Sequence, residues 1–200
     1  MNLRFKKALC IIDVQNDFCS GGALAVPEGD EVVPVLNEYI DFFVKSSFPI
    51  FASRDWHPNE TKHFKNYGGF WPEHCVQNTK GAQFHPRLKL PENAIIISAG
   101  LNFDEDGYSI FEGVDSRGIE FPRVLEDLNI KELYIGGLAT DYCVKHSVLD
   151  ALKSGFKVYL LTDAVKGVNI NPADSKEALM EMMSNGASMA IFEELSKENW

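Results

Sequence analysis

The chain has 200 residues, of which 45% are apolar and 24% are charged, a balance typical of folded globular proteins. The 19 Lys and Arg residues and 29 Asp and Glu residues give a formal net charge of −10. Because nucleic acids and anionic membranes bind basic surfaces, this charge argues against both as partners. The length suits a single domain, 1–200, and the four cysteines at positions 10, 19, 75 and 143 lack the spacing of a disulfide framework.

The N-terminal end has three basic residues before a short apolar run, which faintly resembles a secretory signal. Asp13 interrupts that run early, and no small-residue cleavage site follows. No stretch reaches the roughly 20 apolar residues that a membrane-spanning helix needs. We therefore expect a soluble cytoplasmic protein with reduced cysteines.

Short apolar runs alternate with helical patterns along the chain. Apolar runs bounded by turn residues predict six buried strands, at 8–12, 49–53, 94–98, 132–136, 157–162 and 188–192. Helical periodicity and end signals predict helices at 31–46, 141–154 and 172–185. This alternation predicts an α/β fold, a Rossmann-like three-layer sandwich whose six-stranded, mostly parallel sheet has helices on both faces.

The alternation is interrupted at 54–92, a segment with no clear strand but with two Trp and four His residues. A loop of this length inside a compact domain is usually functional. We interpret it as an insertion that carries binding residues.

Asp13 directly follows the first predicted strand. In parallel sheets, ligands bind outside the carboxyl ends of the strands, so Asp13 is a candidate catalytic carboxylate. A turn or helix-capping carboxylate is the alternative interpretation.

Cys143 lies near the start of the helix predicted after the fourth strand. The helix N-terminus would lower the pKa of its thiol, and the backbone N–H groups there could bind an oxyanion. This position is what a nucleophile needs, whereas a small buried core residue is the alternative. Core packing is the interpretation for Cys10, and Cys19 and Cys75 are weaker candidates in loops.

A third group of candidates lies in the long loop, where Asp55 and His57 are two residues apart. In an extended segment, that spacing points both side chains to one side. With a third ligand from His63 or His74, the set suits Zn²⁺, Fe²⁺ or Mn²⁺. Surface histidines in a polar loop are the alternative.

The sequence resembles the nicotinamidases of the isochorismatase-like cysteine hydrolase family from the first strand nearly to the C-terminus. The motifs that carry the resemblance in combination are DWHP, WPEHCVQ and ATDYC. The resemblance implies hydrolysis of nicotinamide, or pyrazinamide-like amides, to the acid and ammonia, a reaction of NAD salvage. It also makes a homo-oligomer an expectation.

The resemblance also assigns roles to residues of the reaction. Asp13 would take the proton of the Cys143 thiol, which would attack the amide carbon, release ammonia and leave a thioester for water to hydrolyse. The backbone N–H groups of Ala139 and Cys143 would bind the oxyanion, and the Leu138–Ala139 peptide matches a position that is cis in the family.

The family's metal ligands match residues of the long loop. Asp55, His57 and His74 correspond to ligands of one divalent ion, expected to be Zn with Mn or Fe as alternatives. His63 matches a fourth ligand that only some members have. The metal would hold the pyridine nitrogen and ordered water. The residues that match the substrate pocket are Phe18, Trp71, Tyr108, Leu138 and Tyr142.

Ala99 is a departure from the family, which has a catalytic Lys just after the third strand. The flanking residues match, and 100–114 contains no Lys that could replace it. Losing one member of such a catalytic group commonly costs several powers of ten in rate. We expect an inactive or weakened variant, engineered to trap substrate or intermediate, with a naturally divergent member as the alternative.

Two other functions remain open. A related hydrolase could act on isochorismate or another small amide, and such relatives generally lack the metal loop. A non-catalytic protein could instead use the pocket to bind nicotinamide-like ligands, and Ala99 is the only feature that favours it.

Overall fold

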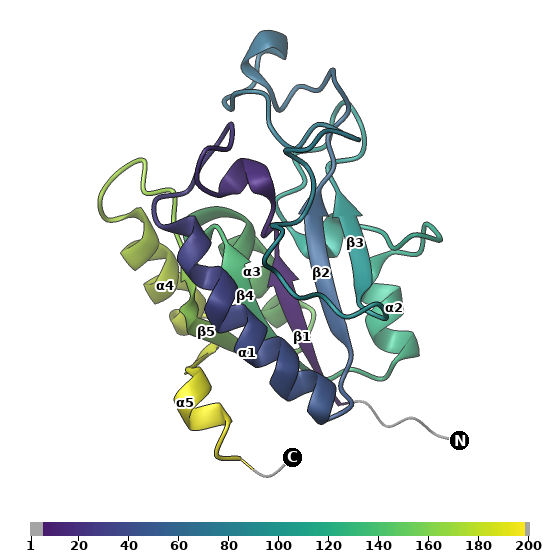
Figure 1. Ribbon diagram of the computed structural model, residues 1–200, viewed down its shortest axis with the longest axis vertical. Helices are drawn as coiled ribbons and strands as arrows, with labels where there is room; N and C mark the ends of the chain where they lie inside the picture. The colour runs from purple at the N-terminus through teal and green to yellow at the C-terminus, as the bar shows by residue number, and fades with distance from the viewer. Residues whose placement is uncertain (1–5, 199–200) are drawn as a thin grey trace.

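The computed structural model describes residues 6–198 and contains a six-stranded sheet in the order β3-β2-β1-β4-β5-β6. Every neighbouring pair in the sheet is parallel, and the strands alternate with helices along the chain (Figure 1). The strands are β1 (Lys7–Ile12), β2 (Ile50–Asp55), β3 (Ile95–Ala99), β4 (Glu132–Leu138), β5 (Lys157–Lys166) and β6 (Ser188–Ala190).

Helices cover both faces of the sheet and bury two separate apolar clusters. On one face, α1 and α5 pack over the cluster that includes Leu36 and Leu195. On the other face, α2, α3 and α4 cover the cluster that includes Val148 and Met182. The predicted three-layer sandwich is therefore confirmed. The helices are α1 (Val32–Lys45), α2 (Phe121–Asp127), α3 (Lys145–Lys153), α4 (Asp174–Ser184) and α5 (Phe192–Leu195).

The six predicted strands and three predicted helices all form, but the structure adds two short helices. The helices α2 and α5 have only seven and four residues, too few for a helical period to stand out in the sequence. The helix predicted from residue 141 begins as a π-helical turn, Thr140–Val144, before α3 continues it. Cys143 lies in that turn.

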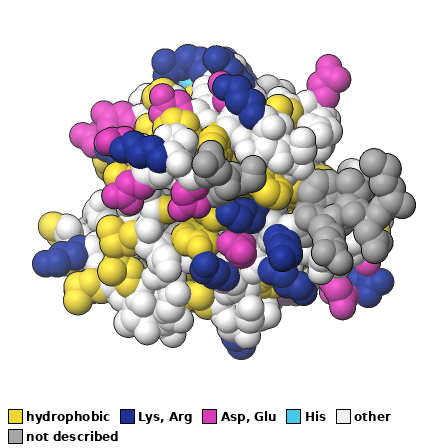
Figure 2. Space-filling model, turned by 90° about the horizontal axis from the view of Figure 1, so that it is seen from below, with side chains coloured by type: hydrophobic (Ala, Val, Ile, Leu, Met, Phe, Trp, Pro, Cys, Tyr) yellow, Lys and Arg dark blue, Asp and Glu magenta, His cyan; other side chains and the backbone are white. Residues whose placement is uncertain are grey.

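The long loop between β2 and β3 lies beyond the carboxyl ends of the central strands, at the top of Figure 1. Seen from the opposite end, the surface has basic and acidic side chains interspersed with apolar ones (Figure 2). The net charge of −10 therefore does not form a single acidic patch on that face. The candidate residues belong to the loop end of the sheet.

Candidate active site and metal centre

Four neighbouring strands end at the candidate residues. Asp13 follows β1, Asp55 is the last residue of β2, Ala99 is the last residue of β3, and Cys143 lies five residues beyond β4. Because these strands are adjacent and parallel, their carboxyl ends meet at one edge of the sheet. The ligating atoms of Asp13, Asp55 and Cys143 lie within 4.8 Å of one another.

Asp13 is 3% exposed, and its carboxylate is held by the neighbouring strand. The Ser53 hydroxyl donates to Asp13 Oδ1 at 2.6 Å, and the Asp13 N–H donates to the same hydroxyl at 3.2 Å. A carboxylate oxygen of Asp13 also lies within 4.8 Å of the Cys143 sulfur. Burial, and then the charge of Asp55, raise the pKa of Asp13 well above its ordinary value. Asp13 therefore binds a proton more readily than an exposed carboxylate does.

The prediction that the helix start lowers the Cys143 pKa is wrong. Burial raises the pKa of this thiol well above its ordinary value, and the carboxylates of Asp13 and Asp55 raise it further. The reason is the packing around the thiol: Cys143 is buried at the cavity wall near two carboxylates from other strands, and the side chain at the end of β3 is the uncharged Ala99. The helix dipole is too small to offset this burial.

The backbone between β4 and α3 places Cys143 close to β1. Gly137 has a φ of +128°, and a Cβ there would collide with the Ile12 carbonyl oxygen, so only glycine permits this approach. The next peptide bond, Leu138–Ala139, is cis, as the resemblance implied. The Asp141 carboxylate then accepts hydrogen bonds from the backbone N–H groups of Val168 at 2.9 Å and Asn169 at 2.7 Å. These contacts hold Val168 at the cavity wall.

Asp55 and three histidines converge beside this pair. The ligating nitrogens of His57, His63 and His74 lie within 4.8 Å of one another. Asp55 Oδ2 is 3.5 Å from His57 Nε2 and 3.7 Å from His74 Nε2. Burial opposes ionisation of Asp55, but the neighbouring imidazoles of His57 and His74 lower its pKa below the ordinary value. The centre thus presents one carboxylate and three imidazoles.

Unpartnered polar atoms at this centre fit a divalent cation. His57 is fully buried, and neither of its ring nitrogens has a hydrogen-bond partner. Asp55 Oδ1 is buried without a partner as well. Buried polar atoms without partners are rare in native proteins, and one explanation is an ion. Imidazole and carboxylate are the ligands that Zn²⁺, Fe²⁺ and Mn²⁺ accept.

A second cluster contains residue types that can bind metals, but the nitrogens of its histidine already have partners within the protein. Cys19, Asp30 and His85 also bring their ligating atoms within 4.8 Å. His85 Nε2 lies 3.3 Å from Asp30 Oδ1, and His85 Nδ1 accepts a hydrogen bond from the Arg87 N–H at 3.2 Å. Because an imidazole that accepts at Nδ1 carries its proton on Nε2, both nitrogens of His85 have partners. Of these two clusters, the one at His57 is the one that leaves ring nitrogens unpartnered.

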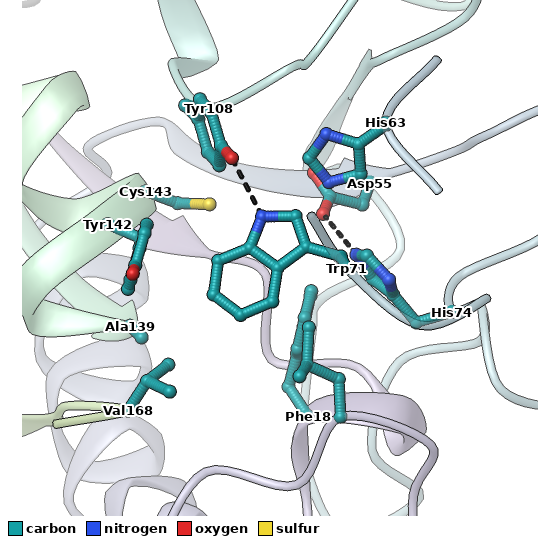
Figure 3. A pocket seen from close by; sticks show the side chains of 11 residues that line it. Phe18, Asp55, His63, Trp71, His74, Tyr108, Ala139, Tyr142, Cys143 and Val168 are labelled. Atoms are coloured by element: carbon teal, nitrogen blue, oxygen red, sulfur yellow. Dashed lines mark hydrogen bonds and ion pairs between the residues drawn. The ribbon is translucent and has the colours of Figure 1, made fainter. Parts of the chain in front are cut away.

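A cavity opens between Cys143 and the histidines (Figure 3). The Trp71 indole N–H donates to the Tyr108 hydroxyl at 2.7 Å, and the Trp71 ring packs edge-on against Tyr142 at 4.8 Å. These aromatic walls suit a flat ring. The lining residues are Phe18, Leu24, Asp55, His63, Trp71, His74, Tyr108, Ala139, Tyr142, Cys143 and Val168.

One predicted pocket residue lies elsewhere, and two lining residues were missed. Leu138 is fully buried in the apolar core and does not line the cavity. Leu24 and Val168 line it, but no local pattern marks either residue. Gln15 was missed too: its side chain donates to the Asp55 carbonyl and accepts from the Asp55 N–H, both at 2.8 Å. Its position two residues after Asp13 was the feature of the sequence that could have identified Gln15.

Gly100 is expected to be needed for the position of His57. Gly100 has a φ of +67°, and a Cβ there would lie 2.5 Å from Cε1 and 2.6 Å from Nδ1 of His57. We expect Gly100→Ala to lower the free energy of unfolding by about 1–3 kcal/mol and to weaken metal binding. Chemical denaturation and metal titration measure the two effects.

Gly155→Ala is the matched control, because Gly155 has a φ of +83° but a Cβ added there would meet no other atom within 4 Å. It should cost similar stability through the backbone and leave metal affinity unchanged. Equal metal affinity in both variants would contradict the role of Gly100.

Among residues 6–198, no helix is both long enough and apolar enough to cross a membrane.

Residues 7–193 match the family described as the isochorismatase domain. A nicotinamidase of Escherichia coli is 45% identical over 199 residues, covering 92% of this chain and 93% of the relative. A nicotinamidase/pyrazinamidase of Mycobacterium tuberculosis is 36% identical, covering 88% and 94%. The pyrazinamidase of Pyrococcus horikoshii, solved in complex with zinc, is 48% identical with a TM-score of 0.86, covering 94% and 99%.

Proposed function

Since the chain belongs to the isochorismatase domain family, we propose that it is an amidohydrolase that converts nicotinamide to nicotinate and ammonia. Relatives that carry the name nicotinamidase support the substrate, and they match nearly the full length of the chain. Pyrazinamide, a carboxamide on a similar flat ring, is the second expected substrate.

The observation that carries this proposal is the buried pair of Asp13 and Cys143 beside an aromatic cavity that Cys143 lines. A carboxylate oxygen of Asp13 lies within 4.8 Å of the Cys143 sulfur. Trp71 and Tyr142 form walls on which a pyridine ring would stack, and His63 and His74 line the side next to the metal centre. A thiol, a base and a flat pocket together suit nucleophilic attack on an aromatic amide.

The chemistry follows from the positions of the two groups. Asp13 takes the proton from the Cys143 thiol, and the sulfur forms a bond to the amide carbon. The proton then passes to the amide nitrogen, the C–N bond breaks, and ammonia leaves a thioester on Cys143. Asp13 next takes a proton from water, whose oxygen attacks the thioester carbon, and nicotinate leaves as the thiol is restored. The backbone N–H groups of Ala139 and Cys143 are the proposed oxyanion donors.

The proposed metal ligands are Asp55, His57 and His74, with His63 as the fourth. When bound, the ion supplies a Lewis acid that attracts the pyridine nitrogen and ordered water. Zinc is the preferred ion because a pyrazinamidase in this family was solved with it, and Mn and Fe suit the same ligands. Four free cysteines suit a reducing compartment such as the cytoplasm.

Ala99 limits this proposed activity. Side chains alternate along a strand, so Ala99 points to the same face of the sheet as Ile97, which packs in the cluster that also contains Cys143. Its register partner is Asp55. A cation at this position would offset the negative charges of Asp13 and Asp55, whereas the methyl group of Ala99 carries no charge. We propose that turnover is weak for this reason. Ammonia release from nicotinamide, measured for this chain and for Ala99→Lys, tests the function.

The metal centre is tested by removing one histidine from each cluster. We expect His57→Ala to lose the bound metal, because its buried nitrogens have no other partner. His85→Ala, which removes a histidine from the self-satisfied cluster, should retain it. Elemental analysis of the purified proteins, and metal titration after chelator treatment, give the metal content per chain. Metal lost from His85→Ala and kept by His57→Ala would place the centre at the other cluster.

A further inference from the structure

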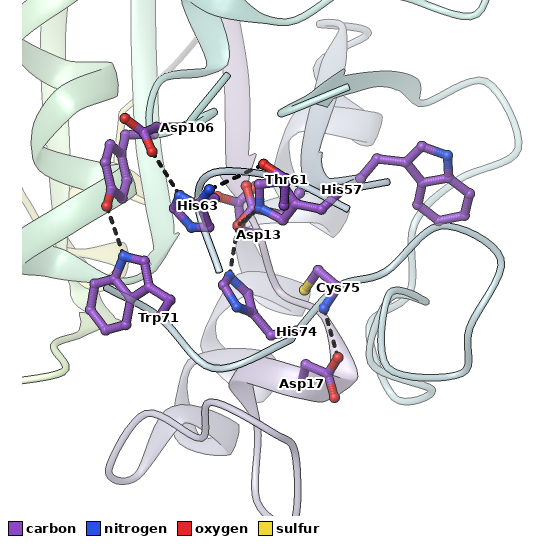
Figure 4. A network of polar contacts seen from close by, with 12 residues as sticks. Asp13, Asp17, His57, Thr61, His63, Trp71, His74, Cys75 and Asp106 are labelled. Atoms are coloured by element: carbon purple, nitrogen blue, oxygen red, sulfur yellow. Dashed lines mark hydrogen bonds and ion pairs between the residues drawn. The ribbon is translucent and has the colours of Figure 1, made fainter. Parts of the chain in front are cut away.

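His63 is held from outside the metal centre by a residue of the loop that follows β3. Asp106 Oδ1 lies 2.9 Å from His63 Nδ1. The His63 side chain is 2% exposed, whereas that of Asp106 is 64% exposed. His63 therefore sits between a carboxylate at the surface and the buried ligand cluster (Figure 4).

This contact determines which nitrogen of His63 is available to an ion. A carboxylate accepts a hydrogen bond, so Nδ1 of His63 carries the proton and Nε2 keeps its lone pair. His74 is oriented in a similar way, with Nδ1 2.8 Å from the Pro72 carbonyl oxygen. His57 has no such partner.

The two segments that carry Asp106 and His63 are also joined by contacts that do not involve the carboxylate. The Lys62 N–H donates to the Phe103 carbonyl at 2.9 Å, and the Thr61 hydroxyl donates to the same oxygen at 3.1 Å. Lys62 also forms an ion pair with Asp104. Removing the Asp106 carboxylate should therefore leave the segments in place and affect only the orientation and basicity of His63.

We propose that Asp106 is a positioning residue that makes His63 a metal ligand, by fixing its tautomer and raising the electron density at Nε2. This inference rests on the metal centre in the proposed function. A carboxylate hydrogen-bonded to a ligating histidine typically strengthens metal binding about 10- to 100-fold. With Asp106 in place, His63 is oriented toward the ion and is a strong fourth ligand.

Zinc titration against a chromogenic chelator, starting from metal-free protein, tests the proposal. Asp106→Ala should weaken Zn²⁺ affinity by about 10- to 100-fold. Asp106→Asn, which keeps an acceptor oxygen without the charge, should weaken it less. The matched control is Asp104→Asn, which removes a carboxylate from the same loop without touching His63 and should bind Zn²⁺ as the parent chain does.

A double-variant cycle shows whether Asp106 acts through His63. Once His63→Ala has removed the ligand, adding Asp106→Ala should cause no further loss of Zn²⁺ affinity. The absorption spectrum of bound Co²⁺ should change in the same way in Asp106→Ala and His63→Ala, which reports on coordination rather than on folding.

Each alternative outcome has a distinct meaning. Unchanged affinity in Asp106→Ala, or an equal loss in the His63→Ala background, would overturn the role of Asp106 while leaving the metal centre intact. If the parent chain binds no Zn²⁺, Mn²⁺ or Fe²⁺, the metal centre itself fails and the inference fails with it. Asp106→Asn carries the test if Asp106→Ala does not fold.

Discussion

The Ala99→Lys variant is expected to hydrolyse nicotinamide about 10³- to 10⁴-fold faster than the chain itself, the scale on which members of catalytic groups act. Burial and the neighbouring carboxylates keep the pKa of Cys143 high, so the thiolate is scarce. An ammonium group at the end of β3 would lower the pKa of both Asp13 and Cys143 by favouring their charged forms. Ammonia release at saturating nicotinamide measures kcat, and its dependence on concentration gives KM.

Ala99→Met is the matched control, because it adds a side chain of similar length without a charge. It should bring no gain in rate, since the expected effect comes from the positive charge and not from the added bulk. If Ala99→Lys binds nicotinamide and its metal but remains inactive, the chain is a binding protein for nicotinamide-like ligands. A fast parent chain that gains nothing from Ala99→Lys would show that this chemistry does not use a cation at position 99.

Cys143→Ala, made in the Ala99→Lys background, is expected to reduce nicotinamide hydrolysis by at least about 10⁴-fold. Removing a nucleophile leaves only the binding and electrostatic contributions to the rate, as in hydrolases that lose a catalytic serine. The same variant should still bind nicotinamide, because the aromatic walls and the histidines of the cavity are unchanged. Ammonia release measures the loss, and calorimetry measures the binding.

Cys10→Ala is the control for Cys143→Ala. Cys10 is fully buried inside β1, and burial raises the pKa of its thiol far above the ordinary value, so this thiol stays protonated. Its substitution should leave the rate within a few fold of the parent. In the Ala99→Lys variant, which keeps Cys143, acid quenching during turnover should trap a nicotinoyl thioester that mass spectrometry detects. Retained activity in Cys143→Ala would instead indicate attack by water at the metal centre.

The sequence by itself predicted the fold and the residues that end its strands. Six short apolar runs separated by helical patterns admit few arrangements other than a parallel sheet covered on both faces. Asp13 was recognisable because it comes at the end of an apolar run, Asp55 because it lies two residues before His57, and Cys143 because it comes shortly after an apolar run. These are local signals, set by side-chain spacing of two or 3.6 residues, and they need no knowledge of contacts between distant segments.

The tertiary structure decided how these residues behave. The pKa of Cys143 rises and does not fall, because it depends on burial and on carboxylates from other strands, while the helix dipole acts only locally. Asp106 and His63 are 43 residues apart in the sequence, and they are partners only because the fold places their two loops side by side. Desolvation and pairing between distant segments are properties of the packed chain, and no periodicity in the sequence encodes them.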